Sequence, residues 1–193
     1  MSRDESRTNG DGKLVVITGP SGAGKSSISR EALRRTGAEF SVSATTRRPR
    51  AGETDGREYR FVCREEFETM RDRGELLEWA EVFGELYGTP AGPVRRAVAE
   101  GRTILLEIDV QGGLQVHETM PEATFILVLP PDGEELARRL RGRGSEDADS
   151  LNRRLSKANE EIETARRSGV YEHVVINDDL EQAINEVVRI VEN

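Results

Sequence analysis

The chain has 193 residues, of which 35% are hydrophobic and 33% are charged, and its formal net charge is −8 at pH 7; these values predict a soluble globular protein with one sizeable core that can carry insertions. The acidic balance argues against nonspecific binding to nucleic acid. The longest apolar runs, such as residues 125–129, are too short to span a bilayer, so we expect no membrane partner.

The chain begins with a polar segment, residues 1–12, that predicts a disordered tail without the apolar core of a signal peptide. An apolar strand, residues 14–17, then leads into Gly-Pro-Ser-Gly-Ala-Gly-Lys-Ser at residues 19–26. The pattern G-x-x-x-x-G-K-[ST] after a strand is typical of a loop whose N–H groups bind phosphate oxygens at a helix N-terminus. The alternative is a glycine-rich turn that only connects two elements.

The phosphate-binding interpretation assigns roles within this loop. Lys25 can reach the outer phosphates of a nucleoside triphosphate as a point charge, and the Ser26 hydroxyl can bind Mg²⁺. A helix is expected over residues 25–36, ended by Gly37. The residues expected to bind the triphosphate are Gly19, Pro20, Ser21, Gly22, Ala23, Gly24, Lys25, Ser26 and Ser27.

The next part of the chain, residues 41–91, predicts an insertion that is rich in glycine, arginine and short strands. We expect strands at residues 41–46 and 59–62 and a short helix at residues 65–73. Cys63 is the only cysteine. An intrachain disulfide is therefore excluded, and the cytoplasm is the expected compartment.

The rest of the chain returns to strands and helices that alternate. A helix is predicted to begin at Pro93 and stop at Gly101, and buried strands are predicted at residues 103–109 and 123–129. A charged helical segment at residues 133–143 and a long helix capped by Ser150 follow. The chain is expected to end with a strand at residues 174–176 and a last helix capped by Asp179, with Leu180 facing inward. Apolar strands that alternate with amphipathic helices predict an α/β fold, with a central parallel sheet covered by helices on both faces. Residues 130–167 are highly charged and nearly all helical, which is typical of a mobile flap.

A second cluster of charged residues lies in the predicted insertion. Arg47 and Arg50 stand three positions apart around Pro49, which stiffens the backbone, and Tyr59 follows nearby. Two guanidinium groups and a phenol could hold a second phosphate group. A solvated, arginine-rich hairpin fits the same residues, and the residues alone leave both interpretations open.

Residues 43–62 resemble the nucleotide-monophosphate signature of the guanylate kinase family, S-x-T-T-R-x-P-R-x-G-E-x-x-G-x-x-Y-x-F-V, with Ala44 at a variable position. The resemblance runs from about Lys13 to the C-terminus. It continues through residues 77–80, 87–89, 107–112, 139–140, 143–144, 154–155 and 177–178. It implies a P-loop fold with a core at residues 13–40, 97–131 and 168–193, a GMP-binding insertion at residues 41–96, and a helical lid at residues 132–167.

The resemblance implies two groups of residues for GMP. Ser43, Glu78 and Asp109 would hold guanine, since a carboxylate accepts hydrogen bonds from the N1–H and the exocyclic amine, a donor pair that adenine lacks. Arg47, Arg50, Tyr59 and Tyr87 would bind the GMP phosphate, and Arg47 and Arg50 would aim its attacking oxygen. Thr89, also implied for the GMP site, keeps a hydroxyl where the family often has serine.

The resemblance also implies residues for ATP and Mg²⁺. Arg139, Arg143 and Arg154 match lid arginines that reach the transferring phosphoryl group, although composition alone favours a solvated helical face. Asn177 falls where the family holds adenine. Glu107 or Asp109 would order water bound to Mg²⁺, unless the pair only ends a strand; the sequence does not decide between the two acids.

The implied reaction is transfer of the γ-phosphoryl group of ATP to GMP, with Mg²⁺ as cofactor. Two alternatives stay open: a domain of this fold that binds phosphopeptides without catalysis, and a small kinase that acts on another acceptor. The intact phosphate loop argues against the first, and Ser43 with Glu78 argues against the second. The sequence leaves open the formation of a homo-oligomer, the use of deoxy-GMP and the role of the N-terminal tail.

Overall fold

The computed structural model describes residues 12–141 and 148–193. Its central sheet has five strands in the order β2–β7–β1–β8–β9, and every neighbouring pair is parallel. The strands are β1 (Lys13–Thr18), β2 (Glu39–Phe40), β7 (Thr103–Glu107), β8 (Thr124–Leu129) and β9 (His173–Ile176). The expected parallel α/β sheet is confirmed, and the carboxyl ends of β1 and β7 lie side by side, with Ile17 paired to Glu107.

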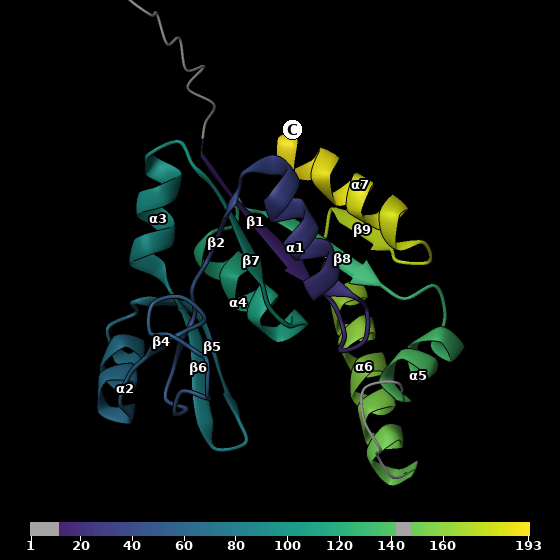
Figure 1. The fold of residues 1–193 in the computed structure, drawn as a ribbon, viewed down its shortest axis with the longest axis horizontal. Helices are drawn as coiled ribbons and strands as arrows, with labels where there is room; N and C mark the ends of the chain where they lie inside the picture. Colours follow the sequence, from purple (N-terminus) through teal and green to yellow (C-terminus); the bar gives the residue numbers. More distant parts are fainter. Residues whose placement is uncertain (1–11, 142–147) are drawn as a thin grey trace, which may run out of the picture.

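Helices cover both faces of this sheet (Figure 1). Val15 and Ile17 point into a core shared with α1 (Lys25–Thr36) and α7 (Leu180–Glu192). Leu14 and Val16 point to the other face, against α3 (Ala91–Ala99) and α4 (Val110–Thr119). Because successive side chains alternate between the two faces, a strand buried on both sides is apolar along its whole length.

A second, smaller sheet is built from the inserted segment. Its order is β4–β3–β6–β5, with β4 (Arg60–Phe61), β3 (Ala44–Thr45), β6 (Glu85–Pro90) and β5 (Leu76–Val82). Helix α2 (Arg64–Asp72) buries Phe67 and Met70 against one face of this sheet. The small sheet therefore has its own core, separate from the cores on the central sheet (Figure 1).

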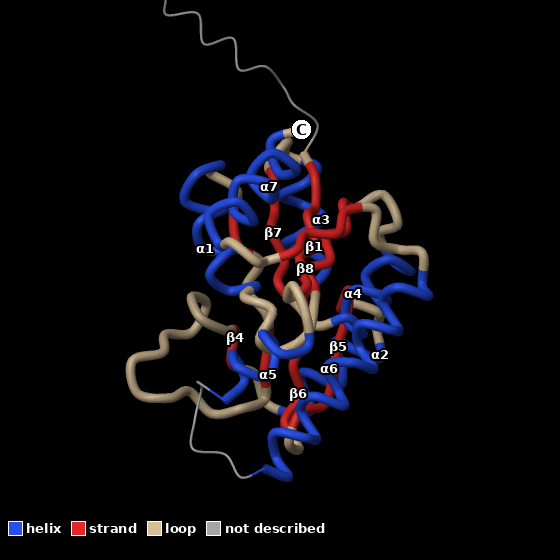
Figure 2. The backbone as a smooth tube through the Cα atoms, turned by 90° about the vertical axis from the view of Figure 1, so that its right-hand side faces the viewer, coloured by secondary structure: helices blue, strands red, loops and turns tan. Residues whose placement is uncertain are grey.

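Two helices project from the end of the central sheet at which the phosphate loop lies. Helix α5 (Gly133–Arg141) packs on α6 (Ala148–Ser168) through Leu136, Leu140 and Ala158. In both views α6 runs away from the central sheet and past α5 (Figures 1 and 2). Within the described residues, no helix is long and apolar enough to cross a membrane.

Several expected element boundaries are wrong, for identifiable reasons. The strand expected at residues 103–109 ends at Glu107, because the Asp109 side chain caps α4, a helix that the sequence pattern did not predict. Helix α3 begins at Ala91, so Pro93 is its third residue and not its first. Proline is tolerated there because the N–H groups of the first turn have no partner within the helix.

Other expectations fail at the ends of elements. Helix α6 begins at Ala148, so Ser150 lies inside its first turn and does not cap it. Leu180 is 45% exposed and not buried, since it is the first residue of α7. The strands expected at residues 41–46 and 59–62 shrink to two residues each.

Candidate active site

The phosphate loop lies between β1 and α1, where the sequence predicts it. Gly22 and Gly24 have φ values of 92° and 95°, and Gly24 is the N-cap of α1. A Cβ atom on Gly24 would collide with the side-chain amide of Asn177, which donates a hydrogen bond of 2.8 Å to the carbonyl of Ala23. Glycine is therefore required at residue 24 by both the backbone conformation and the close approach of Asn177.

The loop holds its lysine close to its own backbone. The Nζ atom of Lys25 donates hydrogen bonds to the carbonyls of Gly19 and Pro20, at 2.5 and 3.0 Å. These bonds place the ammonium group against the loop at the N-terminus of α1. The end of the helix dipole and the lysine charge then favour the same anion.

The residue after the lysine contacts an acid at the end of the neighbouring strand. The hydroxyl of Ser26 donates a 2.6 Å hydrogen bond to Oε1 of Glu107, the last residue of β7. A hydroxyl oxygen and a carboxylate beside a phosphate loop fit the preference of Mg²⁺, which takes oxygen ligands and keeps several waters and substrate phosphates. Asp109, the other candidate acid, uses Oδ1 to accept the Gly112 N–H at the start of α4.

Glu78 is a buried acid on β5. Its side chain is 7% exposed, and Oε1 accepts a 2.7 Å hydrogen bond from the hydroxyl of Thr89 on β6. Oε2 points at the first turn of α4, because a Cβ on Gly112 would lie 3.2 Å from it. Burial raises the pKa of Glu78 to about 7; the nearby charge of Asp109 raises it further, and the Thr89 hydrogen bond opposes the shift.

An aromatic and arginine cluster lies on the same small sheet and the loop beside it. The Arg47 guanidinium lies 5.4 Å from the ring centre of Tyr59, and the rings of Tyr59 and Tyr87 meet edge to face at 6.0 Å. Arg47 also forms a two-pronged ion pair with Glu53, at 2.9 and 3.0 Å, which lowers the pKa of the Glu53 carboxyl. Arg50 donates its backbone N–H to Glu53, at 2.7 Å. The guanidinium is thus fixed by Glu53 over an aromatic ring.

Arginines of α5 and α6 reach the phosphate loop and the residues that support it. Arg154 donates to the hydroxyl of Ser21 at 3.3 Å. Arg139 binds Glu135 at 2.6 Å and the carbonyl of Asn177 at 2.8 Å. Arg143 lies outside the described residues, as do residues 1–11 of the expected N-terminal tail.

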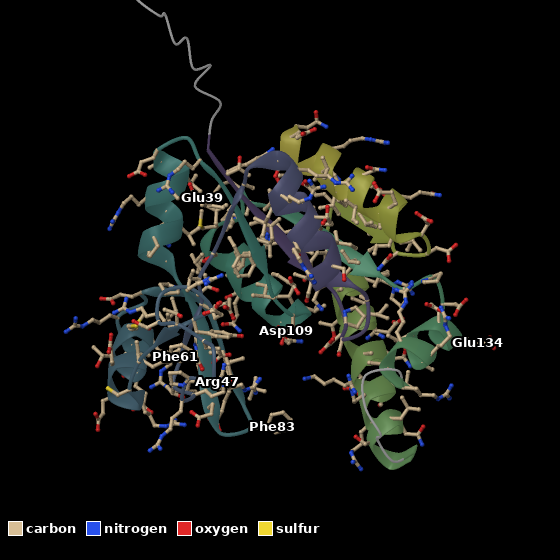
Figure 3. All side chains as sticks on the ribbon, in the orientation of Figure 1. Glu39, Arg47, Phe61, Phe83, Asp109 and Glu134 are labelled. Atoms are coloured by element: carbon tan, nitrogen blue, oxygen red, sulfur yellow. The ribbon has the colours of Figure 1, made fainter. Side chains whose placement is uncertain are left out.

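A cleft of about 680 Å³ separates α6 from the tip of the β5–β6 hairpin. Its lining includes Ser21 of the phosphate loop, Arg153 and Arg154 of α6, and Phe83 at the hairpin tip. Phe83 is fully exposed, with a φ of 53°, and projects on the side that faces α6 (Figure 3). The lining carries three cations, Arg153, Arg154 and Lys157, and one acid, Glu161, so positive charge predominates where the cleft meets the phosphate loop.

The site residues form three groups. Lys25 lies on the phosphate loop next to Ser26, which binds Glu107; Thr89 binds Glu78, whose second oxygen lies near the start of α4; and Arg47 contacts Tyr59 and Tyr87. Figure 3 shows Arg47 beside the small sheet and Asp109 between the small sheet and the central sheet. Ser43 and Arg50 lie beside the third group: the Ser43 carbonyl accepts the Arg60 N–H, and the Arg50 side chain is exposed.

Sequence reasoning did not single out three polar residues at this site. Glu53 orients Arg47, and its place inside the matched signature is the signal that could have identified it. Burial raises the pKa of Glu161 on α6, and the charges of Asp109 and Lys25 act on this carboxyl in opposite directions. Gln115 on α4 binds the backbone of Trp79. No sequence pattern marks Glu161 or Gln115.

Comparisons with known proteins agree on one family. A family model described as guanylate kinase matches residues 11–193. A guanylate kinase from Synechocystis is 46% identical over 186 residues, which cover 96% of each chain, and one from Rhodococcus jostii is 47% identical and covers 93% of this chain and 87% of its own. A crystal structure of guanylate kinase from Anaplasma phagocytophilum has a TM-score of 0.70 and 34% identity, over 94% of this chain and 85% of its own. A shikimate kinase from Bacteroides thetaiotaomicron, at 15% identity and a TM-score of 0.50 over 94% of this chain and 99% of its own, is similar in fold alone.

Proposed function

The chain belongs to the guanylate kinase family and is an ATP:GMP phosphotransferase, and we propose that the three groups of residues described above bind its two nucleotides and the metal ion. The reaction transfers the γ-phosphoryl group of ATP to GMP and gives ADP and GDP. The acceptor is already an anionic phosphate oxygen, so no side chain has to remove a proton from it. Positioning and charge neutralisation then carry the catalysis.

At the ATP end, the phosphate loop holds the triphosphate. Lys25 neutralises charge on the outer phosphates, and the backbone N–H groups at the start of α1 bind the inner ones. Arg139, Arg154 and Arg143 stabilise the charge on the transferring group. The contacts of Arg154 with Ser21 and of Arg139 with the Asn177 carbonyl support this role for two of these arginines. Asn177 also remains the residue proposed to hold adenine.

At the GMP end, Arg47, Arg50, Tyr59 and Tyr87 bind the phosphate, and Arg47 and Arg50 aim the attacking oxygen. Ser43, Glu78, Thr89 and Asp109 bind guanine. One observation carries this assignment: Glu78 is a buried carboxylate, held by Thr89, with its second oxygen turned toward the start of α4. Guanine offers this carboxylate an N1–H and an amine, whereas adenine would leave it unpaired at a cost in binding.

Mg²⁺ fits beside the phosphate loop, and we propose that Ser26 and Glu107 hold it there with the phosphates of ATP. The ion neutralises charge on the β- and γ-phosphates when it is bound. Of the two candidate acids, Glu107 is the better supported. It contacts Ser26 directly, whereas Asp109 caps α4 and faces Glu78.

The proposal extends to three parts of the chain: a P-loop core, a GMP-binding insertion at residues 41–96 and a lid at residues 132–167. The separate core of the small sheet and the packing of α5 on α6 support this division. Closure of the insertion and the lid would exclude water that otherwise hydrolyses ATP. A cytoplasmic location, expected from the single cysteine, also belongs to this proposal.

A coupled assay of ADP release tests the function directly. With MgATP, we expect turnover with GMP and little or none with AMP, CMP or UMP supplied in separate reactions. Turnover with another acceptor would favour a different small kinase on this fold. A lack of turnover with all four would favour a phosphopeptide-binding domain, and phosphopeptides would then be titrated against the cluster around Arg47 and Tyr59.

The Mg²⁺ assignment predicts the phenotype of Glu107→Gln. The amide can still accept the Ser26 hydrogen bond but loses the negative charge near the ion. We expect the Mg²⁺ concentration for half-maximal rate to rise about 10-fold or more, the range seen when groups around a metal site are changed. The measurement is a titration of free Mg²⁺ at fixed ATP and GMP. Glu192→Gln, an exposed change at the end of α7, is the control; an unchanged Mg²⁺ requirement in Glu107→Gln would refute the assignment.

A further inference from the structure

Gln115, in the second half of α4, binds a strand of the other sheet. Its Oε1 atom accepts the backbone N–H of Trp79 at 3.1 Å, and its Nε2 atom donates to the Trp79 carbonyl at 3.1 Å. Both polar atoms of the side-chain amide are thus used on the main chain of one residue. The Trp79 ring is not part of this contact; it is 37% exposed and lies under the guanidinium of Arg71.

The strand that Gln115 binds is an edge of the small sheet. Strand β5 pairs with β6 on one side only, and Trp79 stands opposite Gly88 in that pair. The outer edge of such a strand carries backbone groups that another strand would normally satisfy. The amide of Gln115 takes the place of that missing strand at one residue and ties β5 to α4.

Glu78 directly precedes Trp79 in β5, and a β-bulge lies directly before Glu78. Leu76 stands opposite Pro90 and Glu78 stands opposite Thr89, so β5 has one extra residue at Leu77. A bulge of this kind rotates the side chains that follow it. Leu76, Leu77 and Glu78 are consequently all buried, where a regular strand would bury every second residue. Glu78 is therefore held between the bulge on one side and the Gln115 amide on the other.

The same helix carries the surface that Glu78 faces. Asp109 caps α4, and Gly112 in its first turn lies beside Oε2 of Glu78. Gln115 stands three residues after Gly112, so one rigid helix defines both the wall opposite the carboxylate and the anchor of its strand. A carboxylate that must accept two hydrogen bonds from one base edge has to lie in the plane of that base, and small displacements break the second bond first.

We infer that Gln115 is a positioning residue that sets the carboxylate of Glu78 for guanine and so contributes to base selectivity. The inference rests on the proposed role of Glu78 as the residue that recognises guanine. Its sharpest consequence concerns the exocyclic amine, because hypoxanthine keeps the N1–H of guanine but lacks that amine. Gln115 then controls how well the protein distinguishes GMP from IMP.

Gln115→Leu removes both hydrogen bonds and leaves an uncharged aliphatic side chain that ends at the Cδ position. We expect the ratio of kcat/KM for GMP to that for IMP to fall about 10-fold and KM for GMP to rise by a similar factor, since a misplacement of about 1 Å can cost on the order of 100-fold. KM for ATP is expected to change less than about twofold, because α1 and the phosphate loop are untouched. Gln115→Glu keeps the acceptor for the Trp79 N–H and is expected to give an intermediate ratio.

A purely structural role for Gln115 would lower the melting temperature and leave the GMP-to-IMP ratio unchanged, and that result would overturn the inference. If Gln115→Leu does not fold, the ratio measured for Gln115→Glu decides in the same way. Gln182→Leu makes the same chemical change at an exposed position of α7 and should leave the ratio as in the wild type. A wild-type protein that does not distinguish GMP from IMP would contradict the proposed role of Glu78 itself, which separates the two failures.

Discussion

Replacement of Lys25 by alanine is expected to reduce kcat by about 10³-fold or more, with ATP and GMP both saturating. The ammonium group lies against the carbonyls of Gly19 and Pro20, at the N-terminus of α1. In the proposed role it would neutralise charge that develops between the outer phosphates in the transition state, and the loop's N–H groups could not move to replace it. The loss should therefore appear in kcat, beyond any change in the affinity for ATP.

The measurement for Lys25→Ala is steady-state ADP release with GMP as acceptor, compared at several ATP concentrations. Lys13→Ala removes the same charge at the opposite end of β1 and is the control for a general effect of net charge. An unchanged folding transition with a lost rate would confirm the role in catalysis. A Lys25→Ala protein with an undiminished rate would refute the phosphate-loop assignment altogether.

The phosphate loop could be predicted because its determinants are local. An apolar strand, glycines at the positions that need positive φ, and a lysine at the start of a helix are all read within about a dozen residues. The parallel sheet was equally readable, since β1, β7 and β8 are apolar between their terminal residues and bury both faces. The order of the strands depends on long-range pairing, which no local pattern contains.

Helix α4 and the β5–β6 hairpin could not be read in this way. Gly112 and Gly113 weaken the helical pattern of α4, yet a Cβ on Gly113 would come within 2.7 Å of Thr18 and of Tyr171, so close packing requires the glycine. In the hairpin, the bulge at Leu77 breaks the alternation expected of a strand, and Phe83 takes a left-handed turn position that asparagine usually fills.

Glu78, which is proposed to recognise guanine, and Gln115, which is proposed to position it, illustrate the limit of motif reading. Glu78 and Gln115 are 37 residues apart, and they meet only because α4 packs against the edge strand β5. No spacing rule connects them, and the role of Glu78 was implied by family resemblance and not by its neighbours in the chain. Its burial and the direction of its second oxygen emerge only from the tertiary structure.

Replacement of Glu78 by glutamine is expected to lower the ratio of kcat/KM for GMP to that for AMP by on the order of 100-fold. The amide can still accept the hydrogen bond of the Thr89 hydroxyl, so the pocket keeps its shape. It offers only one acceptor to guanine, however, and its NH₂ group opposes the donors of the base. Adenine, with an acceptor at N1 and a donor at its exocyclic amine, is penalised less.

The raised pKa of Glu78 adds a pH dependence to this comparison. Because the pKa is about 7 in the folded protein, the carboxyl is largely protonated at pH 6 and ionised at pH 8. Wild-type kcat/KM for GMP is expected to rise through this interval, as the second acceptor becomes available. The profile of Glu78→Gln should lack that rise, because an amide does not titrate. Thr89→Ser, which keeps the hydroxyl donor, is the matched control and should retain the wild-type profile.

Ionisation of Glu78 is expected to favour the binding of GMP but to lower the stability of the free protein. A carboxyl whose pKa is higher in the folded than in the unfolded state favours folding while it is protonated, and this contribution is lost as the pH rises through about 7. Ionised Glu78, buried and close to Asp109, therefore destabilises the free protein at pH 8. Glu78→Gln should melt several degrees higher than the wild type at pH 8, given about 2–4 °C per kcal/mol for a chain of this size, and the difference should shrink toward pH 5. If the variant is less stable than the wild type at pH 8, interactions in the folded protein favour the charged form of Glu78. The penalty for leaving a buried carboxylate unpaired could then no longer explain the preference for guanine.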